Sequence, residues 1–141
     1  MIKVLILLSA GLASDPSVMD MLMSPHAVPL DVVLSDAQYT ELLSLARNPK
    51  TPFYARVRAI GLAGLRHDPG AEKLWAEART WDDPELRIQA AYAQALARSR
   101  DPVAFAAFVR ALLADKDKDL QDVGRVVSGQ WRRGERGGAL K

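Results

Sequence analysis

The chain has 141 residues, of which 49% are hydrophobic and only 6% aromatic, a composition that suits one small helical domain built on Ala and Leu. It contains no cysteine, which excludes disulfides, thiolate metal sites, a cysteine nucleophile and a lipid anchor on cysteine. The net charge is +2, but residues 14–131 hold 14 Lys and Arg against 16 Asp and Glu, a net charge of −2, so we expect no nucleic-acid partner.

Residues 1–13, "MIKVLILLSAGLA", join one cation, an apolar run and a small-residue end before Ser14. This order is typical of a secretory signal segment and predicts a periplasmic or secreted protein. The alternative is a cytoplasmic protein in which these residues form a buried first helix or strand. The run is far shorter than the roughly 20 residues that cross a bilayer, so we expect no transmembrane span.

Residues 14–50 predict helices joined by a proline-containing link. We expect Asp15 to cap a short helix that ends near Met23, because Pro16 would stand at its first position. Pro25 and Pro29 are too close for a helix between them. A second helix is predicted over residues 36–47, where Ser35 and Gln38 form a capping box.

Asp-Pro pairs punctuate the rest of the chain. An Asp before a helix accepts hydrogen bonds from first-turn N–H groups, and a Pro beside it loses no bond. Such starts occur at Asp68, Asp83 and Asp101, with Thr51-Pro52 as an equivalent and Asp115 to Asp119 as a proline-free version. Asp82 and Glu85 also fit a capping box. The starts form two interleaved series with one period of about 33 residues, which is typical of a solenoid of helix pairs.

The helices between these starts show apolar stripes at spacings of three and four. In the second helix of each pair the stripe residues are Ala71, Leu74, Trp75 and Ala78, then Phe105, Phe108, Val109, Leu112 and Leu113, with Arg110 opposite. The first helices, residues 52–66 and 84–98, are apolar on more than one face, so we expect them to pack between neighbours. Gly61 and Gly64 indicate a close helix approach.

The segments "YARVRAIGLAGLRHDP" and "AEKLWAEARTWDDP", then "ELRIQAAYAQALARSRDP" and "VAFAAFVRALLADKDKD", then "LQDVGRVVSGQW", resemble the HEAT and HEAT-like helical repeats, in their short-period bacterial form. The resemblance places Arg56 and Arg87 at the arginine position of the first helices. It implies an all-α fold, a short right-handed α-solenoid of antiparallel helix pairs with an irregular N-terminal capping segment. Its repeats would be residues 51–82, 83–114 and a partial 115–131, followed by a basic flexible tail, 132–141.

Enzyme and metal chemistry find little support in the sequence. Asp115, Asp117 and Asp119 are spaced like the start of a calcium loop, but Leu120 stands where the loop needs Gly and Val126 where it needs Glu. His26 and His67 lack a metal-ligand spacing. No nucleophile elbow, phosphate-binding glycine loop or dinucleotide fingerprint is present, so we expect no catalysis, no metal and no cofactor.

The sequence therefore favours a non-catalytic scaffold that binds a protein partner on the face formed by the second helices. The candidate contact residues are Lys73, Glu77, Arg79, Trp81 and Arg110, whereas Trp75 is expected in the core. An array with an unsealed C-terminal end also predicts pairing into a homodimer. The alternatives are a nucleic-acid binder similar to HEAT-like DNA glycosylases and, with less support, an accessory subunit similar to HEAT-like bilin lyases.

Overall fold

The computed structural model describes residues 17–29, 31–66 and 68–137, with side chains up to residue 130. In these ranges every regular element is a helix, so the expected all-α class is confirmed. Residues 1–13 and His67, on which some expectations rest, lie outside the described residues. The expected cap of the first helix at Asp15 is wrong, because Ser17 is the N-cap and its hydroxyl accepts the backbone N–H of Asp20. The helices are α2 (Val18–Met23), α3 (Asp36–Arg47), α4 (Phe53–Leu62) with a 3-10 turn (Ala63–Leu65), α5 (Pro69–Ala78), α6 (Pro84–Ala97), α7 (Pro102–Leu113) and α8 (Lys118–Gly137).

The Asp-Pro starts act as the sequence predicts. Asp68, Asp83 and Asp101 are the N-caps of α5, α6 and α7, and each carboxylate accepts a first-turn backbone N–H while Pro occupies the first helical position. The capping box of Ser35 and Gln38 at the start of α3 is also confirmed. The box proposed for Asp82 and Glu85 is wrong. Asp83 caps α6 instead, because it stands directly before Pro84 and accepts from the N–H groups of residues 85 and 86.

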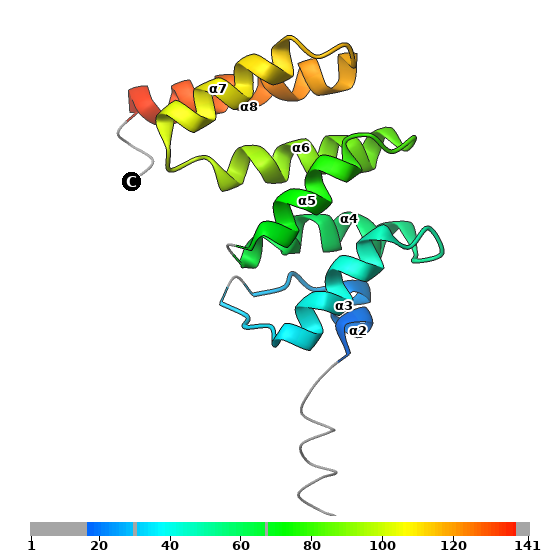
Figure 1. Ribbon diagram of the computed structural model, residues 1–141. Helices are drawn as coiled ribbons and strands as arrows, with labels where there is room; N and C mark the ends of the chain where they lie inside the picture. The colour runs from blue at the N-terminus through cyan, green and yellow to red at the C-terminus, as the bar shows by residue number, and fades with distance from the viewer. Residues whose placement is uncertain (1–16, 30, 67, 138–141) are drawn as a thin grey trace, which may run out of the picture.

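The helices pack as antiparallel hairpins, with α3 along α4, α5 along α6 and α7 along α8. The hairpins are joined mainly through their second members, since α4 packs on α6 and α6 packs on α8 (Figure 1). The short helix α2 lies against α4 and α3, at the end of the molecule away from α8 (Figure 1). Across the described residues, no helix is both long and apolar enough to cross a bilayer.

Helix α6 divides the interior into two hydrophobic clusters. Leu86, Ala90 and Ala93 point into the cluster that α2 to α5 form, whereas Ala91 and Ala95 point into the cluster with α7 and α8. Both faces are therefore buried, as expected for residues 84–98. The hairpin partner of α6 is α5, however, and not α7, with which the sequence pairs it. Alanine suits this position because its small side chain lets helices approach closely on both sides.

Trp75 lies in the core as predicted, with 2% of its surface exposed. Its indole N–H donates to the carbonyl of Ile60 at 2.8 Å, so the buried polar atom is satisfied. Gly64 permits this packing, because an added Cβ would lie 3.3 Å from the Trp75 ring. Gly61 likewise faces Gln89 of α6, with 3.1 Å between an added Cβ and the amide nitrogen. Both glycines are therefore in close contact with a neighbouring helix, in each case through the end of a side chain and not through its backbone.

The stripe predicted on α7 is mostly correct. Phe105, Phe108, Val109 and Leu112 are buried and Arg110 is exposed, but Leu113 is 43% exposed. Leu113 is the last residue of α7, where the chain turns toward α8 and the buried stripe has already ended at Leu112. Helix α8 continues through residues 132–137, the first part of the segment expected to be a flexible tail.

The two-sided burial of α6 predicts that enlarging its alanines destabilises the protein. Ala91→Leu should lower the free energy of unfolding by about 1–3 kcal/mol, because the added atoms must displace α7 or α8. Ala97→Leu, at an exposed position of the same helix, is the control and should change it by less than about 0.5 kcal/mol. Urea denaturation measures both values. Equal effects of the two substitutions would contradict the packing described for α6.

Candidate functional site

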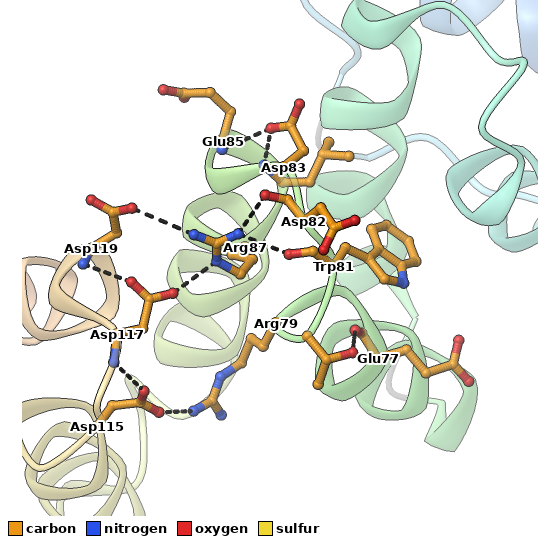
Figure 2. A network of polar contacts seen from close by, with 12 residues as sticks. Glu77, Arg79, Trp81, Asp82, Asp83, Glu85, Arg87, Asp115, Asp117 and Asp119 are labelled. Atoms are coloured by element: carbon orange, nitrogen blue, oxygen red, sulfur yellow. Dashed lines mark hydrogen bonds and ion pairs between the residues drawn. The ribbon is translucent and has the colours of Figure 1, made fainter.

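The turns that join the hairpin partners lie along one edge of the molecule (Figure 1). These turns, which we call the loop edge, are residues 48–52, 79–83 and 114–117, between α3 and α4, α5 and α6, and α7 and α8. Contacts between guanidinium groups and carboxylates connect successive turns. Figure 2 shows the part of this network between the second and third turns.

Arg87, in the first turn of α6, connects two turns of the loop edge. Its Nη1 donates to the carbonyls of Trp81 at 2.8 Å and Asp82 at 2.7 Å, both in the turn before its own helix. Its Nε lies 2.8 Å from a carboxylate oxygen of Asp117, and its Nη2 lies 3.6 Å from Asp119 (Figure 2). The side chain is only 18% exposed, so solvent screens these contacts weakly.

The aspartates of the third turn are held by backbone hydrogen bonds as well as by arginines. The Asp115 carboxylate accepts the backbone N–H of Asp117 at 2.8 Å, and Asp117 accepts that of Asp119 at 2.9 Å. Burial raises the pKa of Asp117, but hydrogen bonds from the Asp119 backbone and from Arg87 outweigh it and lower the pKa below its usual range. The residues spaced like a calcium loop thus serve as arginine partners, and the described residues hold no cluster of three His, Asp or Glu suited to a metal ion.

Arg79, at the C-terminus of α5, makes the second connection between these turns. Its Nη2 lies 3.6 Å from Asp115, its Nη1 donates to the side-chain oxygen of Gln94 at 3.2 Å, and its guanidinium lies 5.6 Å from the ring centre of Phe108. Gln94 is 4% exposed on α6, a polar group buried between α5 and α7. Arg79 therefore connects α5 to the α7–α8 hairpin through contacts within the chain.

Arg98 extends the polar contacts along α6. Its two Nη atoms contact the two carboxylate oxygens of Glu72 at 2.8 Å and 3.2 Å, and its guanidinium lies 4.8 Å from the ring centre of Phe108. Bidentate pairing fixes both side chains. As a result, Phe108 contacts the guanidinium groups of both Arg79 and Arg98, which link α7 to α5 and α6.

Between the first and second turns the loop edge contains an open groove of about 510 Å³. Trp81 lies in its wall with the guanidinium of Arg56 4.9 Å from the ring centre. Arg56 donates through Nε to the carbonyl of Ala46 at 3.0 Å. The remaining lining residues include Arg47, Pro49, Thr80, Asp82 and Leu86. The groove thus combines apolar surface, an aromatic face and charges of both signs.

Arg47 is held at this groove by an ion pair with Glu77. Its Nε lies 2.7 Å from a Glu77 carboxylate oxygen, and the side chains are 35% and 39% exposed. The hydrogen bond from Arg47 is the main reason that the pKa of Glu77 is lowered. Lys73 adds a smaller attraction. The pair connects the end of α3 to the end of α5.

The five residues that the sequence indicates as partner contacts divide into two groups. Glu77, Arg79 and Trp81 meet at the loop edge, and each contacts an arginine or a carboxylate of the chain itself. Lys73 and Arg110 are exposed on α5 and α7, outside the groove lining. Trp81 lies in the turn after α5, which ends at Ala78, and is partly buried.

Sequence reasoning missed the central role of Arg87 and Asp117. Arg56 and Arg87 stand at matching places near the starts of α4 and α6, and that correspondence was the available signal. Comparison of the chain with protein-family models, curated proteins and solved structures finds no match. Any function must therefore be inferred from the chemistry of the loop edge itself.

Arg87→Gln tests the network. At about pH 7 the substitution should lower the free energy of unfolding by about 2 kcal/mol, because hydrogen bonds to charged groups are lost in a partly buried place. Since the folded-state pKa of Asp117 is lowered, its contribution is complete above the unfolded value of about 4 and disappears as the pH falls through the lowered value. The difference between wild type and variant should therefore shrink toward about pH 3.

Urea denaturation across this pH range provides the measurement. Arg110→Gln is the matched control, because Arg110 is exposed and has no ion-pair partner among the described residues. It should change stability by less than about 0.5 kcal/mol at each pH. A loss for Arg87→Gln that is no larger than for the control would show that the network does not stabilise the fold.

Proposed function

We propose that this protein is a non-catalytic scaffold module that binds a polypeptide partner in the groove beside Trp81. The observation that carries the proposal is the composition of that groove, in which an aromatic ring and two arginines border an open surface of mixed polar and apolar character. Trp and Arg are enriched among the residues that dominate protein–protein binding energies. An open groove with polar borders suits a segment of extended chain.

The same proposal includes the finer fold expected from the sequence, a short right-handed α-solenoid of HEAT-like repeats. The order in which α4, α6 and α8 pack supports it, because each hairpin adds one helix to the same stack. So does the repetition of caps at Asp68, Asp83 and Asp101. In such an array, turns from successive repeats gather at one edge and supply a composite surface.

The groove differs from the face first expected to bind the partner, the outward side of the second helices. Lys73 and Arg110 are the exposed candidates on that face. Glu77, Arg79 and Trp81 relate instead to the loop edge, and only Trp81 lines the groove. The aromatic and arginine surface therefore favours the loop edge over the helix face.

A nucleic-acid partner is the alternative, and the charges of the groove oppose it. Asp82 and Asp83 border the same groove as Arg47 and Arg56, so a phosphate backbone would meet carboxylates as well as guanidinium groups. The net charge of −2 over residues 14–131 has the same consequence. A role similar to the bilin lyases has no supporting feature at the groove.

Site-specific photo-crosslinking in the cells that express the protein tests the function. A photoreactive amino acid at Thr80, which is exposed in the groove lining, should give one discrete adduct with a partner protein. The same amino acid at Lys73 and Arg110 tests the helix face, and at Glu41, exposed on α3, serves as the control. Denaturing electrophoresis and mass spectrometry identify the adducts.

Each pattern of adducts has a definite meaning. An adduct from Thr80 that is absent at Glu41 supports the groove. Adducts from Lys73 or Arg110 alone would move the interface to the helix face, and equal labelling at all four positions would indicate random collision. Absence of any adduct would contradict a scaffold function.

We also propose export, on the pattern of residues 1–13. The intact mass of untagged protein from separated periplasmic and cytoplasmic fractions of a bacterium should show a periplasmic species that starts at Ser14. Cleavage is expected there because small residues precede that position. A cytoplasmic species that retains Met1 or Ile2 would overturn export and make the nucleic-acid alternative worth testing with generic duplex DNA.

A further inference from the structure

Arg56 and Arg87 hold corresponding places in α4 and α6 but have different partners. Arg87 uses Nε to contact the carboxylate of Asp117, in the next turn of the loop edge, and Nη2 to approach Asp119, in the first turn of α8. Arg56 uses Nε for the carbonyl of Ala46. Within the described part of the chain, neither Nη atom of Arg56 has a hydrogen-bond or ion-pair partner.

Within the described residues, the next turn along from Arg56 holds no carboxylate that pairs with it. The residue that corresponds there to Asp117 is Asp83, since each is the last residue before its helix. Asp83 caps α6 by accepting the N–H groups of residues 85 and 86 through Oδ1, and it makes no ion pair with Arg56. Trp81 of that turn lies against the Arg56 guanidinium instead. Arg56 is therefore bordered by an aromatic ring and an open groove where Arg87 has a carboxylate.

We propose that the groove receives an acidic side chain of the partner polypeptide, whose carboxylate binds the Nη atoms of Arg56. The inference rests on the proposed function and names the chemistry of its partner. A guanidinium held by a backbone hydrogen bond and a ring keeps its outer edge in place for a bidentate contact. Arg47, which pairs with Glu77 through Nε and has no hydrogen-bond or ion-pair partner for its Nη atoms among the described residues, adds positive charge nearby.

The surroundings of Arg56 also indicate what flanks the acid. Pro49 and the exposed part of Trp81 provide apolar surface in the same groove. An apolar residue next to the carboxylate would bury that surface. Asp82 repels a segment that is acidic throughout, so a single acid beside an apolar residue fits better than an acidic run.

Titration of isotope-labelled full-length protein with two blocked peptides tests the inference. The first peptide is acetyl-Gly-Glu-Leu-Gly-amide and the second is its glutamine analogue, which has the same shape without the charge. The indole N–H of Trp81 reports binding in NMR spectra, and that of buried Trp75 reports an intact fold. The glutamate peptide should shift the Trp81 signal saturably and bind about tenfold more tightly than the glutamine peptide.

Substitutions at the guanidinium provide the matched variants. Arg56→Gln should remove the preference for glutamate, and Arg56→Lys should restore it in part, because lysine keeps the charge without the bidentate geometry. Arg110→Gln, at an exposed position outside the groove, should bind like wild type. If Arg56→Gln fails to fold, shown by a changed Trp75 signal, Arg56→Lys together with the peptide pair still decides the question.

Other results would overturn the inference. Equal binding of the two peptides, or an unchanged preference in Arg56→Gln and Arg56→Lys, would show that the groove does not select a carboxylate. No shift with either peptide would have the same meaning. The crosslink from Thr80 is separate from these measurements, so a persisting adduct would retain the scaffold function while the acidic partner is rejected.

Discussion

The structure depends on the close packing of α6 on both of its long faces. Ala90 and Ala93 belong to one cluster, Ala91 and Ala95 to the other, and no larger side chain at these places would leave both neighbouring layers where they are. Because the helix is shared, the α7–α8 hairpin has its place set by α6. The turns at the loop edge come into register as a result, and the groove forms between them.

Polar contacts then fix the angle between the hairpins. Apolar packing is not directional. The hydrogen bonds of Arg87 to the carbonyls of Trp81 and Asp82 and to the carboxylate of Asp117, in contrast, form together at only one orientation of the two hairpins. Arg79 and Arg98 also hold the hairpins in one orientation, through the contacts of their guanidinium groups with the Phe108 ring. Arginine therefore serves two purposes along the loop edge. Arg87 has its hydrogen-bond partners within the chain, whereas Arg56 lines the groove.

The sequence predicts those features that depend on neighbouring residues. The caps at Asp68, Asp83 and Asp101 and the bounds of α3 were accessible because capping involves residues two or three positions apart. The carboxylate partners of Arg87 cannot be predicted in this way, since they belong to the next hairpin and their position depends on the angle between hairpins. Glu77 and Arg79 were expected at a partner surface for the same reason, because a charged residue on a helix gives no sign of a distant ion of opposite sign.

Sharing one helix between two clusters also affects the order in which the chain completes its structure during synthesis. The cluster of α2 to α5 is complete once Leu86, Ala90 and Ala93 have emerged from the ribosome, before α7 has emerged. The opposite face of α6 then remains exposed to solvent until α7 and α8 have emerged and packed on it. Besides Ala91 and Ala95, that face carries Ile88 and Tyr92, so it offers apolar area to other nascent chains until the α7–α8 hairpin covers it.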